Sequence, residues 1–204
     1  MKLVIENVSK KFGTHYLFKK INKTLQQGES WAVTGPNGSG KSTFMQIIAG
    51  AIQPTEGKVW FEISPQKIVT IENFFGYTSI VAPYMQLIEE LTVIELVSIH
   101  FKLKPMKGNC DDFLEFCHLT SHKHKSINKL SSGMKQRLKL GLTFFSKAPI
   151  ILLDEPCSNL DNQFFSWYLE NVKFLNQQAE KIIIIFSNSK AEYDWCEDIL
   201  HLSL

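Results

Sequence analysis

The spacing of apolar residues changes twice along this chain. The first third is rich in strand-like runs, in which apolar residues alternate with polar ones or follow one another directly; these runs are residues 3–8, 15–25, 31–34, 58–63 and 74–81. From Thr92 to about Phe145 the apolar residues recur at helical spacing, behind a capping box formed by Thr92 and Glu95. After Pro149 strand-like runs return. The order predicts an α/β core with a helical lobe inserted at about residues 85–145.

The C-terminal part of this pattern is a strand, a helix and two more strands. The strand-like runs are residues 150–153, 182–186 and 198–202, and the predicted helix covers about residues 164–175. Such an alternation of strands and helices favours a parallel sheet.

One turn-rich segment carries a phosphate-binding pattern. Residues 35–43 read GPNGSGKST, which satisfies the Gly-x4-Gly-Lys-Ser pattern in full. A strand precedes it, and the helical face that follows consists of Phe44, Ile47, Ile48 and Ala51. Glycines let successive backbone N–H groups point at one anion, and the helix start adds its positive dipole end. We therefore expect a nucleoside triphosphate here.

Each residue of this segment is a candidate ligand of the nucleotide: Gly35, Pro36, Asn37, Gly38, Ser39, Gly40, Lys41, Ser42 and Thr43. Lys41 should reach the β- and γ-phosphate oxygens, and the Ser42 hydroxyl should ligate Mg²⁺. A dinucleotide site of the Rossmann type is excluded, because Thr43 stands where the third glycine of that pattern belongs.

A second candidate site follows the apolar run at 150–153, where Asp154 and Glu155 are adjacent carboxylates. Taken alone, the segment is equally typical of a strand that runs into an acidic turn. In a parallel sheet with a phosphate-binding loop, we expect this strand beside residues 31–34, with both acids at the phosphate end. Asp154 would hold Mg²⁺, through water, and Glu155 would orient a water molecule for attack on the γ-phosphate.

Composition narrows the class of protein. The chain has 204 residues, 44% of them hydrophobic and 21% charged, with a formal net charge of +2. These values exclude a collagen, a disordered chain and a disulfide scaffold, and they predict no nucleic-acid partner. The aliphatic runs are far shorter than the ~20 residues that cross a bilayer, and the four cysteines form no CxxC pair. We expect a cytoplasmic domain that reaches a membrane only through a partner.

Three further segments complete a family pattern. LSSGMKQR at 130–137 resembles the signature LSGGQ-x-QR, and SNLD at 158–161 resembles the D-loop. Phe12 stands where an aromatic side chain would stack on adenine. With GPNGSGKST as Walker A and ILLDEP as Walker B, the sequence resembles the ATP-binding-cassette (ABC) ATPases, the nucleotide-binding subunits of ABC transporters, over essentially its whole length.

The resemblance implies a P-loop NTPase core with a parallel sheet, an N-terminal antiparallel β section and the inserted helical lobe, all in one ABC ATPase domain of residues 1–204. ATP and Mg²⁺ would be the cofactors. The protein would form a homodimer, or paired cassette, with two ATP at the interface. It would hydrolyse ATP to drive a transmembrane permease on a separate chain, and so lie on the cytoplasmic face of the membrane.

The signature and the D-loop would complete the nucleotide site of the opposite subunit. The resemblance assigns Ser131, Ser132 and Gly133 to the γ-phosphate bound there, and it places Asp161 in the same site. Physically, Ser131 and Gly133 open a helix, and a helix start can bind an anion. In isolation, the segment is more typical of a capped surface helix.

Two positions depart from the family pattern. Asn188 stands where the family usually carries a histidine that contacts the γ-phosphate, and an amide cannot carry positive charge. Asn188 remains a candidate catalytic residue with Lys41 and Glu155, and we expect slower hydrolysis. Ile80 stands where the family has its Q-loop glutamine. Gln86 replaces it only if the loop is re-registered, and Ala82-Pro83 fits that place equally well.

Two alternatives to a transporter subunit stay open. One is a soluble ABC-type ATPase that acts on a non-membrane partner. The other is a slow ATP-dependent dimerisation switch, motivated by Asn188 and the missing glutamine. The intact Glu155 argues against the switch.

Overall fold

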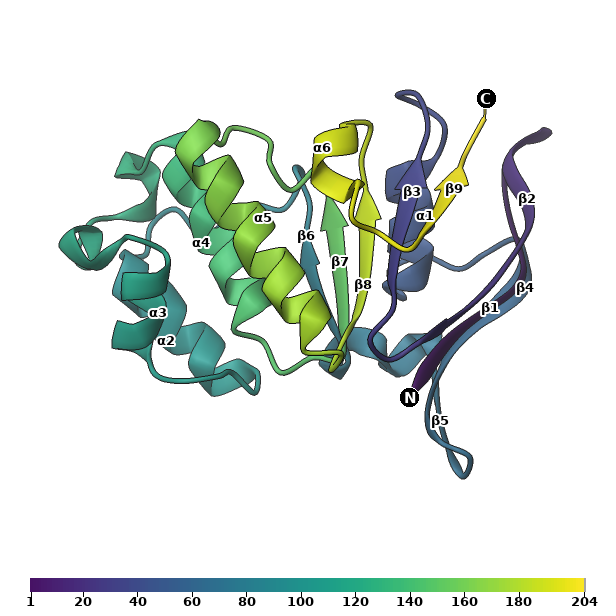
Figure 1. Cartoon of the computed structure of the whole chain (residues 1–204), viewed down its shortest axis with the longest axis horizontal. Coiled ribbons are helices and arrows are strands. Elements are labelled where there is room, and N and C mark those ends of the chain that lie inside the picture. Colours follow the sequence, from purple (N-terminus) through teal and green to yellow (C-terminus); the bar gives the residue numbers. More distant parts are fainter. Residues whose placement is uncertain (204) are drawn as a thin grey trace.

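The computed structural model describes residues 1–203, and its strands form two sheets (Figure 1). The strands of the five-stranded parallel sheet are, in spatial order, β6 (Thr78–Val81), β7 (Ile150–Asp154), β8 (Ile182–Phe186), β3 (Ser30–Thr34) and β9 (Asp198–His201). The strands of the four-stranded antiparallel sheet are β2 (His15–Gln26), β1 (Lys2–Phe12), β4 (Glu56–Ser64) and β5 (Lys67–Thr70). The α/β class is confirmed, with both sheets as expected.

Strands β7 and β8 are buried on both faces, which is why their sequences are almost purely aliphatic. Alternate residues point to opposite faces. One face packs against α1 (Lys41–Ile48) and the antiparallel sheet, and the other packs against α4 (Ser132–Phe144) and α5 (Asn162–Gln177). Figure 1 shows these helices on the two sides of the parallel sheet. The parallel sheet is therefore the middle layer of the molecule.

The helical lobe lies between β6 and β7 in the chain. Its helices are α2 (Val93–Leu103), α3 (Cys110–Phe116) and α4, with 3₁₀ turns η2 (Thr120–His122) and η3 (Ile127–Lys129). Buried side chains such as Val97, Phe113 and Leu138 form a core of its own. The predicted capping box is confirmed, because the Thr92 N–H donates to Glu95 Oε2 at 2.8 Å and the Glu95 N–H donates to Thr92 Oγ1 at 3.4 Å.

The expected strand at 74–81 is wrong in its first half. Residues Ile71–Gly76 form a 3₁₀ helix, η1, and only β6 is extended. Ile71 and Phe74 are buried three positions apart, which is the spacing of a 3₁₀ helix. Strand β5 was not predicted at all.

The helix after the phosphate-binding loop is shorter than its apolar face predicts. α1 ends at Ile48, so Ala51 lies outside the helix and is exposed. Gly50 stops it with φ of 77°, and a Cβ at this position would lie 2.2 Å from the carbonyl oxygen of Ile71.

The expected neighbour of β7 is also wrong. β8, not β7, pairs with β3, and β7 pairs with β8 and β6. Residues 150–153 are therefore separated from residues 31–34 by one strand. The carboxyl ends of all three strands still meet at one edge, because every pair in this sheet is parallel.

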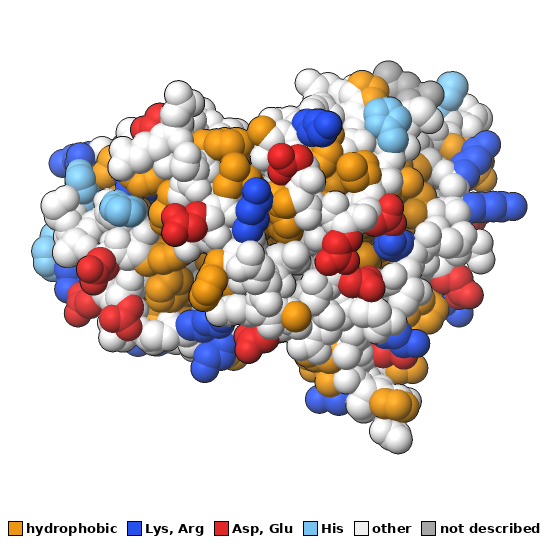
Figure 2. Space-filling view, in the orientation of Figure 1, with side chains coloured by type: hydrophobic (Ala, Val, Ile, Leu, Met, Phe, Trp, Pro, Cys, Tyr) orange, Lys and Arg blue, Asp and Glu red, His pale blue; other side chains and the backbone are white. Residues whose placement is uncertain are grey.

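Within residues 1–203 no helix has the length and apolar character needed to cross a membrane. Basic and acidic side chains are interspersed on the face seen in Figure 2. A four-residue helix, α6 (Lys190–Tyr193), follows β8 at the edge where the strands β3, β7 and β8 end.

Candidate nucleotide-binding site

The phosphate-binding loop is fixed by the helix that follows it. Gly40 has φ of 95° and is the residue before α1, so the chain can turn sharply into the helix. The Phe44 ring then anchors α1 against three other rings, with centroid distances of 5.1 Å to Phe18, 5.9 Å to Trp31 and 6.3 Å to Phe186. These edge-on contacts hold the first turn of α1 above the end of β3.

The first position of the loop accepts only glycine. A Cβ on Gly35 would lie 2.2 Å from the carbonyl oxygen of Leu202 and 2.7 Å from Ser39 Oγ. Its φ of 143° also disfavours other residues. The loop thus packs directly against the backbone that follows β9.

The interior of the loop has the polar groups that an anion needs. The Lys41 side chain is buried, and its Nζ donates to the carbonyl oxygens of Gly35 at 2.7 Å and Pro36 at 3.2 Å. Ser39 Oγ is buried and has no hydrogen-bond partner among the described residues. A buried cation and an unpaired hydroxyl beside a helix start fit a bound phosphate.

The structure brings Ser42 and Asp154 together, although they come from different elements. The Asp154 carboxyl lies at the end of β7, is 2% exposed and is close to the Ser42 hydroxyl. Burial raises the pKa of Asp154, and the Ser42 hydroxyl and Lys41 oppose that shift. A hydroxyl and a carboxylate next to a phosphate loop are a donor set that fits Mg²⁺.

Glu155 follows Asp154 in an unusual backbone conformation. Its φ is 44°, in the left-handed region, and its N–H donates to the carbonyl oxygen of Phe186 at 2.9 Å. The carbonyl oxygen of Pro156 accepts from Gln136 Nε2 at 2.6 Å. The chain around Glu155 is therefore held from both β8 and α4, and its half-buried side chain stays at the edge of the sheet.

Asn188 reaches the phosphate-binding loop. Its Nδ2 donates to Asn37 Oδ1 at 3.0 Å, and both residues are exposed. The loop after β8 and the loop after β3 are thus joined at the edge where Asp154 and Glu155 lie.

The signature residues are not part of this edge within one chain. Ser131 is the N-cap of α4, where its Oγ accepts from the Met134 N–H at 3.3 Å. Ser132 and Gly133 form the first turn, and a Cβ on Gly133 would lie 3.0 Å from the carbonyl oxygen of Asn159. No hydrogen bond found in residues 1–203 joins these three residues to the phosphate-binding loop.

Two further candidates lie apart from the loop. Asp161 is the N-cap of α5, and its Oδ1 accepts from the Phe164 N–H at 3.0 Å. Phe12 ends β1 and is 58% exposed, with Lys10 Nζ 5.2 Å from the ring centroid. Phe12 is therefore accessible to a ligand.

Comparison with known proteins agrees with this geometry. A model of the family described as ABC transporter matches residues 18–158, which include the phosphate-binding loop, the signature and the Asp154–Glu155 pair. The chain belongs to the ABC transporter family. It is an ATP-binding cassette of that family, with the P-loop NTPase fold that the sequence predicts.

Its relatives in the family include ATP-binding proteins named for import and for drug resistance. It is 28% identical over 193 residues to the spermidine/putrescine import ATP-binding protein PotA of Fusobacterium nucleatum subsp. nucleatum, a match that covers 92% of this chain and 51% of that protein. It is 29% identical to the linearmycin resistance ATP-binding protein LnrL of Bacillus subtilis, with 89% and 60% covered. The cassette spans about half the length of PotA.

Solved ABC cassettes have the same fold. The dimeric structure of MJ0796, a bacterial ABC transporter cassette, superposes with a TM-score of 0.82 at 25% identity, over 98% of this chain and 94% of that one. A post-hydrolysis state of MJ0796 bound to ADP and Pi gives a TM-score of 0.83 at 25% identity, with the same coverage.

The loop between β6 and α2 contains a residue that the sequence pattern did not reveal. Partial burial raises the pKa of Tyr84, whose hydroxyl lies near the Gln46 side chain on α1 and near the charge of Asp154. Gln86 instead lines a groove between η1 and the helical lobe. In the cassette, Tyr84 therefore comes near the Ser42–Asp154 pair. A motif that expects glutamine gives no signal for a tyrosine at this place.

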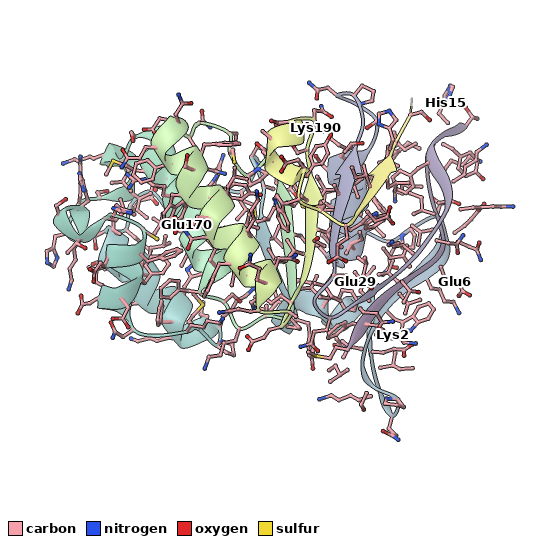
Figure 3. All side chains as sticks on the ribbon, viewed as in Figure 1. Lys2, Glu6, His15, Glu29, Glu170 and Lys190 are labelled. Atoms are coloured by element: carbon pink, nitrogen blue, oxygen red, sulfur yellow. The ribbon has the colours of Figure 1, made fainter. Side chains whose placement is uncertain are left out.

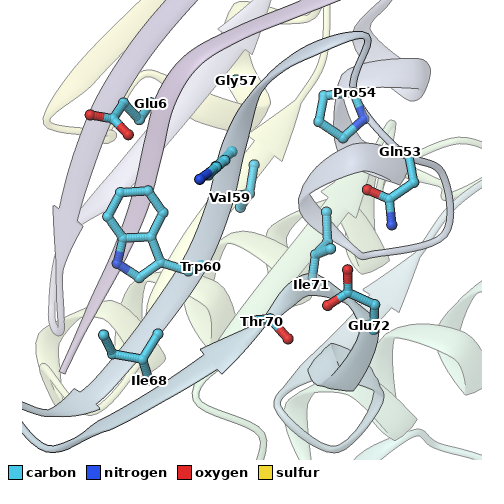
Figure 4. A pocket seen from close by; sticks show the side chains of 11 residues that line it. Glu6, Gln53, Pro54, Gly57, Val59, Trp60, Ile68, Thr70, Ile71 and Glu72 are labelled. Carbon is cyan, nitrogen blue, oxygen red and sulfur yellow. The ribbon is translucent and has the colours of Figure 1, made fainter.

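A separate hollow of about 500 Å³ lies on the antiparallel sheet, away from the nucleotide site (Figure 4). Trp60, Ile68, Thr70 and Glu72 line it. The Thr70 hydroxyl lies close to the Glu72 carboxylate and is the main cause of its lowered pKa, with a smaller contribution from the Gln53 side chain. Thr70 and Glu72 lie at the N-terminal end of η1, so these polar groups belong to the start of that helix.

Proposed function

We propose that this cassette is the ATP-hydrolysing subunit of an ABC transporter, which dimerises around ATP and drives a transmembrane permease on a separate chain. The observation that carries the proposal is the meeting of Ser42 and Asp154 beside the Lys41 loop. Three segments far apart in sequence, residues 35–43, 154–155 and 188, supply a phosphate cradle, a metal pair, a carboxylate and an amide at one edge of the sheet.

The residues divide the work by their chemistry. Gly35–Thr43 and Lys41 bind and neutralise the phosphates, while Ser42 and Asp154 hold Mg²⁺. Bound MgATP supplies an electrophilic γ-phosphate whose charge the metal offsets. The Glu155 carboxylate holds and orients a water molecule and accepts its proton, and the Asn188 amide donates a hydrogen bond toward the same phosphate. Phe12 stacks on the adenine ring.

A second copy completes the site. Ser131, Ser132, Gly133 and Asp161 lie at helix starts, and no hydrogen bond found in residues 1–203 joins them to the phosphate loop of their own chain. A head-to-tail homodimer brings them to the two ATP molecules, and the dimeric arrangement of MJ0796 supports this assembly.

The membrane partner has a surface to bind. A groove of about 550 Å³ separates η1 and β6 from the helical lobe, and its lining includes the side chains of Phe75, Met85, Ile88 and His100. Phe75 is 75% exposed and Ile88 is 55% exposed, so the groove presents apolar surface that a protein partner could bury. We place the permease here, on the cytoplasmic face of the membrane. We also take residues 1–204 as one ABC ATPase domain, with its lobe at about 85–145.

Turnover of ATP tests the enzymatic part of the proposal. Wild type should release phosphate, Lys41→Ala should lose ATP affinity, and Glu155→Gln should bind ATP but accumulate as a dimer. Glu170→Gln is the matched control, because Glu170 is an exposed residue of α5 (Figure 3). Equal turnover in wild type and Glu155→Gln would exclude this hydrolytic site.

Co-purification tests the partner. The tagged cassette should co-purify from gently solubilised host membranes with a multi-span membrane protein in fixed stoichiometry. A soluble partner instead would favour an ABC-type ATPase that acts outside the membrane. Very slow ATP turnover together with ATP-dependent dimer formation would favour the alternative of a slow ATP-dependent dimerisation switch.

A further inference from the structure

The carboxylate of Glu192 lies near the nucleotide site but takes no part in the binding and hydrolysis proposed above. Lys190 opens α6 on the outer surface (Figure 3), whereas Glu192, two residues later, is only 6% exposed. Among the described residues, Glu192 Oε2 has no hydrogen-bond partner. A buried, incompletely paired carboxylate costs stability, so its position calls for a reason.

The Glu192 side chain points back between two loops. It interacts with the Ser187 hydroxyl on one side, and with the backbone N–H and thiol of Cys157 on the other. Ser187 directly follows β8 and precedes Asn188, while Cys157 lies two residues after Glu155. The carboxylate thus contacts both loops that carry the hydrolytic side chains.

The loop of Glu155 needs such support. Glu155 has a left-handed φ of 44°, which an L residue with a side chain rarely adopts without constraint. Its own N–H is fixed to Phe186 at 2.9 Å, and the Ser158 N–H returns to the Glu155 carbonyl oxygen at 3.1 Å. The Cys157 N–H lies between these two anchors and faces Glu192.

We propose that Glu192 is a positioning residue for the hydrolytic site: its carboxylate ties the Glu155 loop to the Asn188 loop, so that the base and the amide keep a fixed relation. The inference rests on the proposed ATP hydrolysis. Because Glu192 is buried behind the two loops, we expect it to act on the rate of the chemical step and not on ATP binding.

The other groups around Glu192 are consistent with this role. The titratable side chains that face it are Cys157 and Tyr168, and the negative charge of Glu155 acts on it from the end of β7. Burial is the main cause that raises the pKa of Glu192, and the Ser187 and Cys157 contacts oppose it. Among the described residues, no basic group contributes to this balance.

Three substitutions separate positioning from mere packing. Glu192→Leu keeps the volume and removes the acceptor; we expect kcat for ATP to fall about ten- to a hundredfold while KM changes less than about threefold, because misplacement by ~1 Å has effects of this size. Glu192→Gln keeps an acceptor oxygen and should restore kcat to within about threefold of wild type. Glu192→Asp shortens the reach, should give an intermediate loss, and serves if Glu192→Leu does not fold.

A second readout needs neither ATP nor turnover. Amide hydrogen exchange of the protein alone should speed up in residues 155–161 and 186–189 for Glu192→Leu, return to the wild-type rate for Glu192→Gln, and stay unchanged elsewhere. The exposed Glu170→Gln variant is the control in both assays.

The outcomes are distinct. Wild-type kcat in folded Glu192→Leu or Glu192→Asp overturns the inference, as does a Glu192→Gln variant as slow as Glu192→Leu, or a loss confined to KM. If wild type and Glu170→Gln both fail to hydrolyse ATP, the proposed function fails instead. The exchange experiment then still decides whether Glu192 ties the two loops.

Discussion

The guanidinium carbon of Arg137 lies 3.7 Å from the centre of the Phe164 ring. Arg137 is on α4 and is the only arginine in the sequence, and Phe164 is in the first turn of α5. The same guanidinium donates from Nη1 to the carbonyl oxygen of Cys117 at 2.9 Å. One side chain therefore ties the signature helix to the end of α3 and to the start of α5.

Arg137→Lys should destabilise the cassette although charge is conserved. An ammonium cannot stack on Phe164 and also reach Cys117, so the loss should be about 2 kcal/mol in the free energy of unfolding. Urea unfolding measures it, with the exposed Lys102→Arg on α2 as a control within about 0.5 kcal/mol of wild type. A double-mutant cycle with Phe164→Leu that shows no coupling would refute the stacking contribution.

Tyr84→Phe should slow basal ATP turnover about threefold to tenfold and raise the Mg²⁺ concentration for half-maximal activity. The change keeps the ring and removes only the hydroxyl that lies near Gln46 and Asp154, and a loss of about 1 kcal/mol corresponds to a rate change of this size. A magnesium titration of the ATPase rate checks it. If Gln86→Ala and not Tyr84→Phe causes the loss, the loop acts through the glutamine.

Local patterns predicted the parts of the site that short segments determine. The glycines of residues 35–40, the helix start at Lys41 and the Asp154–Glu155 pair after an aliphatic strand depend on neighbours in the sequence, and the structure has each of them at the predicted place. Capping works the same way, since Thr92 and Glu95 lie three positions apart.

Features that depend on distant contacts were beyond the sequence pattern. Nothing local shows that β8 separates β7 from β3, because all three are buried aliphatic strands. Tyr84 and Glu192 were not predicted as site residues for a similar reason. A tyrosine in a loop and a glutamate in a short helix are typical surface residues in the sequence, and only the fold places them near Asp154 and Cys157.

Gly141→Ala should destabilise the helical lobe. A Cβ at Gly141 would lie 2.2 Å from Cys117 Sγ and 3.1 Å from the Phe113 ring, so α4 must shift at a cost of about 1–3 kcal/mol. Thermal unfolding checks it, with Gly76→Ala as the control, because a Cβ on Gly76 meets nothing within 4 Å. Adding Cys117→Ala should recover part of the loss; no recovery would mean that the sulfur is not the obstacle.

Lys181 should give a measurable pH dependence of stability. It is 3% exposed, and its Nζ donates to the carbonyl oxygens of Ser146 at 2.8 Å and Ala148 at 2.5 Å, yet burial lowers its pKa to about 8. The unfolded chain keeps this proton up to pH ~10.4, so between those values the unfolded state binds more protons and stability rises with pH.

The difference between wild type and Lys181→Met isolates that contribution from other titrating groups. The unfolding free energy of wild type relative to Lys181→Met should increase by about 2–3 kcal/mol from pH 7 to pH 10. Urea unfolding at several pH values measures it. A difference that stays constant over this range would show that the buried lysine keeps its proton.

Asn188→His should speed hydrolysis and make it depend on pH. Asn188 Nδ2 already donates to Asn37 Oδ1 at 3.0 Å, so a side chain at this position reaches the phosphate loop. An imidazolium there donates a charge-assisted bond, roughly twice as strong as a neutral one, and the turnover rate should rise about threefold to tenfold below pH ~6.5 and fall back above it. The ratio of variant to wild-type rates across pH removes the titrations that both proteins share. Ser189→His places the same ring one residue further on and should show no step, because no hydrogen bond found in residues 1–203 joins Ser189 to Asn37. A step in both variants, or in neither, would mean that position 188 does not act on the reacting phosphate.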